Sequence, residues 1–177
     1  AGYRGTNRPN QPPHYFELIG PAPARSLSTT GADMARFMIA EMKAYSGADS
    51  TLLGKETAQR MQTTMFRPVP PSVGMAVGFF ERDRNGHRIR EHGGDTQWFH
   101  SKLAMFMDDN VGLFMSFNST GKEGAVGKIR EALFAQFADR YFPAPLPELA
   151  KSPDALANAQ VVSGRYAASR RASISES

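Results

Sequence analysis

The chain has no cysteine among its 177 residues, and this absence removes several kinds of chemistry at once. Without cysteine there is no disulfide framework, no thiolate metal site and no cysteine nucleophile. No apolar run approaches the roughly 20 residues that a membrane-spanning helix needs, and the first residues lack the charged start and apolar core of a signal peptide. The chain opens with Ala-Gly-Tyr and not with methionine, so we expect further sequence ahead of it.

The composition is that of a folded globular domain. Hydrophobic residues make up 41% of the chain and charged residues 21%, and twelve Phe with nine Met supply bulky side chains for a core. The net charge is +4, but the 21 basic residues are interleaved with 17 acidic ones. The sequence also has no recognisable nucleic-acid-binding motif, so we expect no nucleic-acid partner.

The first part of the chain predicts an extended loop over residues 1–27 and then two helices. Thr30 is placed to cap the first helix and Gly47 to end it. The second helix is expected within residues 54–66, before Pro68. Apolar residues at helical spacing are expected to face the core, namely Met34, Phe37, Met38, Met42 and Tyr45 in the first helix and Ala58, Met61 and Met65 in the second.

From about residue 73 the apolar pattern changes to a period of two, which predicts strands. Asn85-Gly86 is a strong tight-turn signal between two of them. Further strands are expected on either side of an acidic turn at residues 108–110. A helix over residues 123–141 would then cover one face of the sheet, and its core-facing residues are expected to be Val126, Ile129, Leu133, Phe134 and Phe137. The predicted class is α+β, an α/β sandwich in which an antiparallel sheet is flanked by helices.

A proline-rich stretch, FPAPLPEL, follows the last predicted helix. Such a stretch is typical of a stiff connector between domains. We therefore expect one domain over residues 1–142, and in residues 143–177 a linker and the start of a further domain, with a short helix and the beginning of a strand.

The sequence EHGGD at residues 91–95 is the strongest candidate for chemistry. Glycines at 93 and 94 let the backbone approach a ligand closely, and a strand edge can offer N–H groups to an oxyanion. His92 would stand beside that edge with a titratable ring. The alternative is structural, because His-Gly-Gly also suits a turn or bulge at the start of a strand. A metal site built from His87, His92, Asp95 and His100 is a further alternative, but their spacing is not that of a known ligand set.

Residues 92–118, HGGDTQWFHSKLAMFMDDNVGLFMSFN, resemble the third active-site motif and following hairpin of the serine β-lactamase and penicillin-binding-protein superfamily. The likeness is to its class C-like esterase and DD-peptidase branch, where the triplet is often His-x-Gly. SLSTTGADMARFM and LLGKETAQRMQTTMF are similar to segments that these proteins carry ahead of the triplet. The resemblance implies a partial β-lactamase/transpeptidase-like fold.

The resemblance also implies roles for individual residues. His92 and Gly94 would occupy the first and third places of the triplet, and His92 would hold a substrate carboxylate or support proton transfer. The backbone N–H of Asp95 would be one of two oxyanion donors, pointing at the oxygen on which charge develops during acyl transfer. Three further residues would contact substrate: Gly93, Thr96 and Gln97.

One departure from the family pattern is large. The family acylates a serine in a Ser-x-x-Lys motif, helped by Tyr-x-Asn or Ser-x-Asn, and both precede the triplet. Nothing ahead of residue 92 matches either motif, while Ser119 to Lys122 and Ser116 to Asn118 mimic them in the wrong order. We interpret the first mimic as a strand-to-helix turn with Thr120 capping and Glu123 at the third position.

We therefore expect the chain to be the C-terminal portion of a serine hydrolase domain, with the nucleophile in a missing N-terminal half. The substrate would be a small molecule or peptide with an amide or ester, such as a lactam, a peptidoglycan-type peptide or a simple ester, with no metal and no organic cofactor. The alternative is a penicillin-binding-like binding or scaffold module that has no nucleophile. In this family the location would be periplasmic, secreted or membrane-associated.

Two further expectations follow from the resemblance. VVSGRYAASRRAS is similar to the opening strand of a small β-barrel that follows the hydrolase domain in some relatives. Without the N-terminal strands of the family, the sheet would expose an edge and apolar surface. A homo-oligomer formed through this exposed sheet edge is therefore a further prediction.

Overall fold

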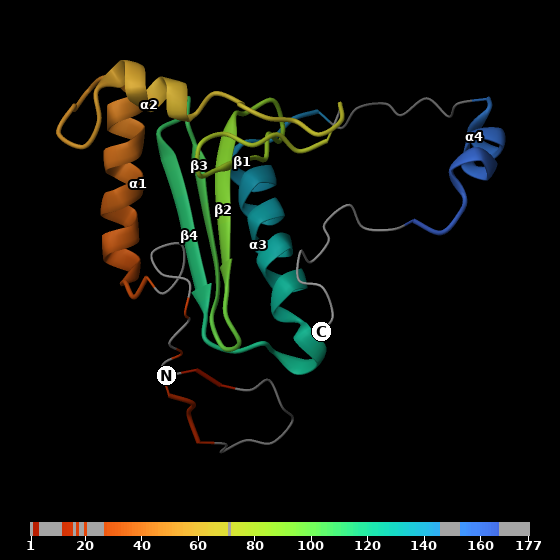
Figure 1. The fold of residues 1–177 in the computed structure, drawn as a ribbon, viewed down its shortest axis with the longest axis horizontal. Coiled ribbons are helices and arrows are strands. Elements are labelled where there is room, and N and C mark those ends of the chain that lie inside the picture. The colour runs from red at the N-terminus through yellow and green to blue at the C-terminus, as the bar shows by residue number, and fades with distance from the viewer. Residues whose placement is uncertain are drawn as a thin grey trace, which may run out of the picture. The chain divides into compact units, whose positions relative to one another are not determined.

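The computed structural model describes residues 2–3, 12–15, 17, 20, 27–70, 72–145 and 153–166. The chain divides into two compact units, Ala1–Ala144 and Pro145–Ser177. The first unit contains a four-stranded sheet with helices beside it (Figure 1). Its elements in chain order are α1 (Gly31–Ser46), α2 (Lys55–Met61), β1 (Phe80–Glu81), β2 (Ile89–Asp95), β3 (His100–Phe106), β4 (Val111–Phe117), the 3₁₀ turn η1 (Lys122–Gly124) and α3 (Val126–Tyr141).

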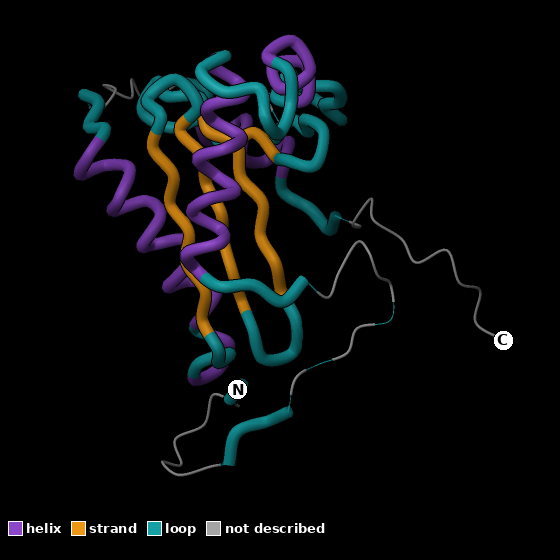
Figure 2. The backbone as a smooth tube through the Cα atoms, turned by 90° about the vertical axis from the view of Figure 1, so that its left-hand side faces the viewer, coloured by secondary structure: helices purple, strands orange, loops and turns teal. Residues whose placement is uncertain are grey.

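The sheet is an antiparallel meander in the order β1-β2-β3-β4. Its two faces are covered by different helices, and Figure 2 shows the strands with helices around them. On one face, Met38 and Met42 of α1 pack against every second residue of β3. On the other face, Phe134 and Ala138 of α3 pack against the intervening residues of β3. The β3 residues are Leu103 and Met105 on the α1 face and Ala104 and Phe106 on the α3 face. The predicted α+β class, with an antiparallel sheet flanked by helices, is confirmed.

The predicted ends of α1 are confirmed. The Thr30 hydroxyl accepts a hydrogen bond from the Asp33 N–H at 3.2 Å, and Gly47 takes the left-handed backbone conformation that glycine allows at a helix end. Met38 and Met42 are buried as expected, but Phe37 is exposed. It lies at the margin of the face that packs on the sheet.

The second helix is shorter than predicted. It ends at Met61, so Met65 lies outside it and is exposed. The chain leaves the helix because Gln62 is buried and its carbonyl accepts a hydrogen bond from the Arg90 Nε at 2.9 Å, while the Met65 N–H donates to the Met75 carbonyl. These long-range contacts replace the next helical turn.

The tight turn at Asn85-Gly86 is confirmed, since both residues have positive φ, 56° and 83°. The strand before it is much shorter than the alternating pattern indicates. Only Phe80 and Glu81 pair with β2, and Met75 makes isolated bridges to Phe66 and Phe80.

The third helix covers one face as predicted, with Val126 and Phe134 buried, but Ile129 and Leu133 are exposed. The predicted cap at Thr120 is wrong. The helix begins after Ala125 with no side-chain cap, and the Val126 N–H donates to the Thr120 carbonyl. The 3₁₀ turn η1 comes between them and separates the Thr120 hydroxyl from the helix.

The second unit contains α4 (Ala155–Val162). The strand predicted to begin near Val161 is not formed over residues 161–166, because Val161 and Val162 belong to the helix. The rest of that predicted strand lies outside the described residues. Among the residues that the structure describes, no helix has the length and apolar character to cross a membrane.

Candidate functional site

The candidate site is built on the outer edge of β2. Backbone groups of a strand alternate between its two neighbours. The Ile89 carbonyl accepts from the Arg82 N–H and the Ile89 N–H donates to the Asp83 carboxylate, both at 3.0 Å, so residue 89 points away from β3. The Arg88 carbonyl instead accepts from Met107, next to β3. Odd-numbered residues of β2 therefore direct their N–H and C=O groups to the outer edge.

Two amides on that edge lie beyond the reach of β1. The short strand β1 ends its pairing where Phe80 meets Glu91. Because β2 alternates, the N–H groups of Gly93 and Asp95 also point to the outer edge, beyond the last residue that pairs with β1. Within the described residues, no strand pairs with these two N–H groups. The Gly94 N–H, by contrast, faces β3, where Gly94 lies opposite Ser101.

His92 lies on the same sheet face as Leu103, its partner in β3, which is the face that α1 covers farther along the sheet. The side chain is exposed, and its ring lies 5.6 Å from the Phe80 ring at an interplanar angle of 28°. It is thus a solvent-accessible imidazole beside the open edge, with one aromatic neighbour that limits its orientation.

The two glycines of the triplet differ in their surroundings. A Cβ on Gly94 would lie 2.8 Å from the Ser101 Oγ, which donates a hydrogen bond to the Gly94 carbonyl at 3.3 Å. A Cβ on Gly93 would meet only the Ser101 carbonyl at 3.6 Å and the Arg130 guanidinium at 4.0 Å, which are ordinary contacts. A methyl group at position 94 would therefore require the Ser101 hydroxyl to rotate away, whereas position 93 has room for a methyl group.

The carboxylate of Asp95 lies on the opposite face, toward α3. Arg130 donates to both of its oxygens, at 2.9 and 3.1 Å, and the His100 Nδ1 lies 2.8 Å from one of them. Burial raises the pKa of this carboxyl, but the bonds from Arg130 and His100 outweigh burial and hold the pKa below its ordinary value of 3.8. The Asp95 side chain is therefore a carboxylate held by Arg130 and His100, while the Asp95 backbone N–H points to the outer edge of β2.

Thr96 and Gln97 form the turn between β2 and β3. The Thr96 hydroxyl accepts from the N–H of Phe99 at 3.0 Å and of Trp98 at 3.3 Å, so it shapes the turn. Gln97 is exposed, and its N–H donates to Glu17. Trp98 is buried, with 8% of its surface exposed.

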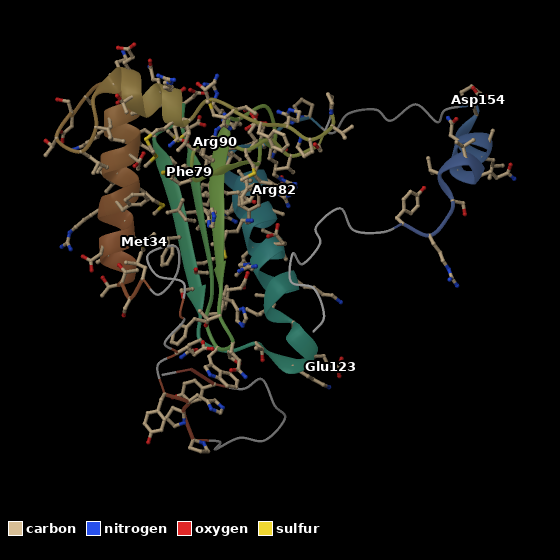
Figure 3. All side chains as sticks on the ribbon, in the orientation of Figure 1. Met34, Phe79, Arg82, Arg90, Glu123 and Asp154 are labelled. Atoms are coloured by element: carbon tan, nitrogen blue, oxygen red, sulfur yellow. The ribbon has the colours of Figure 1, made fainter. Side chains whose placement is uncertain are left out.

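An ion network centred on the buried Lys102 supports the strand on its α3 face. The Lys102 Nζ lies 2.6 Å from Glu91 and 2.9 Å from Glu131, and Arg82 contacts Glu131 at 2.9 Å. The Lys102 side chain is 5% exposed. Figure 3 places Arg82 beside the sheet, Arg90 at the end near α2, and Glu123 at the opposite end, where β2 ends and α3 begins.

The Ser-x-x-Lys mimic has the geometry of a turn. The Ser119 Oγ accepts a hydrogen bond from the Gly121 N–H at 3.2 Å, and the Lys122 side chain is exposed at the start of η1. The structure records no contact between Ser119 and Lys122 in the part of the chain that it describes, so nothing there would activate the hydroxyl.

The four residues of the alternative metal site do not converge. His87 bonds Asp109 at 2.7 Å in the hairpin turn, His92 stacks on Phe80, and His100 bonds Asp95 on the α3 face. Across the described ranges, no group of three or more histidine, aspartate or glutamate side chains is arranged to hold a metal ion.

Three residues next to the site were not found by sequence reasoning: Arg130, Ser101 and Glu17. Arg130 is 35 positions from Asp95 and Glu17 is 80 positions from Gln97. Neither pair has a local signal in the sequence. Ser101 lies within the quoted stretch, and its role depends on the β2–β3 register, which places it opposite Gly94.

Comparison with known proteins places this chain in a family. Among solved structures, the chain is similar to the octameric penicillin-binding protein homologue from Pyrococcus abyssi, at 17% identity and a TM-score of 0.48, over 63% of this chain and 26% of that one. The chain thus spans about a quarter of that protein. No curated protein matches the chain. A family model described as Beta-lactamase matches residues 1–136, most of the first compact unit. The chain belongs to the β-lactamase family, in the superfamily of serine β-lactamases and penicillin-binding proteins.

Proposed function

We propose that this chain supplies the oxyanion strand of a β-lactamase-type serine hydrolase that cleaves an amide or ester through an acyl-enzyme. One observation carries the proposal: β2 continues past its pairing with β1, so the Asp95 N–H lies on an edge with no paired strand among the described residues, in the same strand as the exposed ring of His92. A carbonyl oxygen placed at that edge would gain a backbone donor as its charge develops.

In this mechanism the serine nucleophile comes from sequence outside these 177 residues. The nucleophile attacks the carbonyl carbon, the carbonyl π electrons move to oxygen, and the Asp95 N–H is one of the two donors that stabilise the resulting oxyanion. Collapse of that intermediate breaks the bond to the leaving amine or alcohol, which takes up the proton that the serine hydroxyl released on attack. Water then hydrolyses the acyl-enzyme and frees the serine. His92 is placed to assist that proton transfer or to hold a substrate carboxylate.

The residues around the edge have supporting roles. Arg130 and His100 hold the Asp95 side chain, which fixes the direction of its N–H. Gly94 and Ser101 keep β2 close to β3. Gly93, Thr96 and Gln97 are proposed to line the substrate side of the strand. The same proposal includes a substrate of the lactam, peptidoglycan-peptide or simple ester class and a periplasmic, secreted or membrane-associated location.

The experiment is covalent labelling of the complete gene product by a fluorescent penicillin and a chromogenic short-chain ester, read by mass spectrometry. The 177-residue chain is treated in parallel. The expected result is a label on a serine outside these 177 residues and none on the chain by itself. A label on Ser119 of the chain would contradict the assignment of the nucleophile.

A second candidate is a penicillin-binding-like binding or scaffold module that has no nucleophile. It is supported by the turn geometry of Ser119, whose hydroxyl accepts from the Gly121 N–H and has no recorded contact with Lys122 among the described residues. If neither protein is labelled but both bind a penicillin reversibly in calorimetry, this candidate replaces the hydrolase.

We also propose that the free edge of β4 pairs with β4 of a second copy. The strand VGLFMSF carries no charge to block pairing, and it is at the end of the described sheet. Beside it is a shallow apolar hollow of about 300 Å³ lined by residues that include Leu113, Leu133 and Phe137. Light scattering is expected to show a dimer that Leu113→Lys converts to a monomer, and a monomeric wild-type chain would refute the pairing.

A further inference from the structure

Two neighbouring backbone amides in the β2–β3 turn already hold a carboxylate. The Gln97 N–H donates to one oxygen of Glu17 at 2.9 Å, and the Trp98 N–H donates to the other at 3.1 Å. Hydrogen bonds from N–H groups to an ionised carboxylate are stronger than those between neutral groups. The turn is therefore shaped for a two-oxygen anion, and Glu17 fills it from 80 positions away in the sequence.

The turn keeps this shape through its own contacts. The Thr96 hydroxyl accepts from both Trp98 and Phe99, and the Thr96 N–H donates to the Phe99 carbonyl at 2.8 Å. The Trp98 N–H is thus shared between the Thr96 hydroxyl and Glu17, while the two bonds between Thr96 and Phe99 are local to the turn and do not involve Glu17. The two amides consequently remain aligned when the carboxylate leaves.

Glu17 belongs to an N-terminal strap, defined here as residues 2–3, 12–15 and 17. The His14 ring lies parallel to the Trp98 ring, with centroids 3.8 Å apart and an interplanar angle of 1°. Gly2 packs so closely that a Cβ there would lie 2.3 Å from the Trp98 Cβ. Within the strap, the His14 N–H donates a hydrogen bond to the Gly2 carbonyl, and the Tyr3 N–H donates to the Asn118 carbonyl at the end of β4. His14 and Gly2 of the strap thus cover the Trp98 side chain, which is 8% exposed.

The Glu17 carboxylate is held differently from that of Asp95. Asp95 is paired with a guanidinium and an imidazole, whereas the structure records no cationic side chain on Glu17 within the described residues. Two neutral amides are its recorded partners. A carboxylate bound in this way exchanges with another of the same chemistry, at a cost set by the effective concentration of the tethered group.

We infer that the amides of Gln97 and Trp98 form a carboxylate-binding site, that Glu17 occupies it from within the chain, and that a free carboxylate such as a peptide C-terminus competes with Glu17 for it. The site lies one residue beyond Thr96, at the end of β2. It requires no catalytic step, so it stands independently of the proposed hydrolase activity. A bound ligand would release the strap and expose Trp98.

The test uses the full 177-residue chain and N-acetylglycine as the carboxylate probe, with N-acetylglycinamide as its uncharged control. Three proteins are compared: wild type, Glu17→Gln and Glu56→Gln. Glu56 is an exposed residue of α2, so its replacement makes the same change of charge away from the turn. The amide resonances of Gln97 and Trp98 report binding, and the emission of Trp98, the one tryptophan in the chain, reports the strap.

The expected result is a saturable shift of both amide resonances by N-acetylglycine, at a concentration at least tenfold lower in Glu17→Gln than in wild type or Glu56→Gln. N-acetylglycinamide should shift neither resonance. In wild type, saturation should also move the Trp98 emission to longer wavelength as the strap leaves. Equal affinities in the three proteins, or no saturable shift in Glu17→Gln while the β3 resonances stay unchanged, would overturn the inference.

Discussion

Arg130 of α3 holds both carboxylate oxygens of Asp95, at 2.9 and 3.1 Å, and so fixes the last residue of β2 from the far face of the sheet. Arg130 also donates to the Ser101 carbonyl at 2.9 Å, which ties the helix to the neighbouring strand. The end of β2 is therefore held by a helix that lies 35 positions further along the chain.

Arg130→Gln should destabilise the protein modestly and raise the pKa of Asp95 toward its ordinary value, because the positive charge that lowers it is removed. Since the Asp95 side chain is half exposed, we expect a loss of about 1 kcal/mol in the free energy of unfolding. Arg36→Gln is the matched control, since Arg36 and Asp33 pair on an exposed turn of α1. Urea denaturation and the NMR titration of Asp95 measure both effects, and an unchanged Asp95 pKa would contradict the pairing.

Gly94→Ala should destabilise the sheet by about 0.5–1.5 kcal/mol, because the new methyl group would displace the Ser101 hydroxyl and break its hydrogen bond to the Gly94 carbonyl. Gly93→Ala is the control, since a methyl group there meets only ordinary contacts. Removing the hydroxyl with Ser101→Ala should recover part of the loss caused by Gly94→Ala. Thermal or urea unfolding of the three variants tests this, and equal losses at positions 93 and 94 would refute the packing argument.

Lys102→Met should be strongly destabilising. It leaves the mostly buried Glu91 without its nearest cation, while the half-exposed Glu131 keeps its contact with Arg82. Because only part of this network is buried, we expect a loss of about 2–3 kcal/mol. Lys43→Met, at an exposed position of α1, controls for the loss of charge. A value near that of the control in urea unfolding would show that Lys102 is not part of a coupled network.

Glu41→Gln should stabilise the protein at neutral pH. Glu41 is 4% exposed, and burial raises the pKa of its carboxyl, an effect that the bond from Gln62 only partly opposes. A raised pKa means that the folded state binds a proton more tightly than the unfolded state. The cost of ionising Glu41 therefore begins as pH rises above the ordinary value of 4.5 and is complete above the raised pKa.

The measurement is the difference in unfolding free energy between Glu41→Gln and wild type at pH 4 and pH 7. The difference should favour the variant at pH 7 and shrink at pH 4. Glu56→Gln, on the exposed first turn of α2, is the control for the same change of charge at an exposed position. A difference that is the same at both pH values would mean that burial of the Glu41 charge does not govern the effect.

Local sequence signals predicted local structure well. Asn85-Gly86 forms its turn, and Thr30 and Gly47 bound α1, because each acts through its own backbone conformation or its nearest neighbours. The period-two pattern likewise indicated β3 and β4, where alternate residues pack on opposite faces. His92 lies in β2, the strand that the same pattern predicts after Asn85-Gly86.

Features that depend on distant partners were not predictable in this way. The length of α2 is set by Arg90 and Met75, which capture the chain after Met61. The ion pair between Arg130 and Asp95 joins residues 35 positions apart, and the hydrogen bond from Gln97 to Glu17 joins residues 80 positions apart. A single sequence contains no periodicity that reports such pairs.

The most direct test of the oxyanion strand compares Asp95→Pro with Asp95→Ala in the complete gene product. Both variants lose the carboxylate, but only proline lacks the backbone N–H, and proline is tolerated where that N–H faces away from a neighbouring strand. The rate of covalent labelling by a fluorescent penicillin or a chromogenic ester should fall by about 100-fold or more in Asp95→Pro relative to Asp95→Ala. Equal labelling rates in two folded variants would contradict the assignment of the Asp95 N–H as an oxyanion donor.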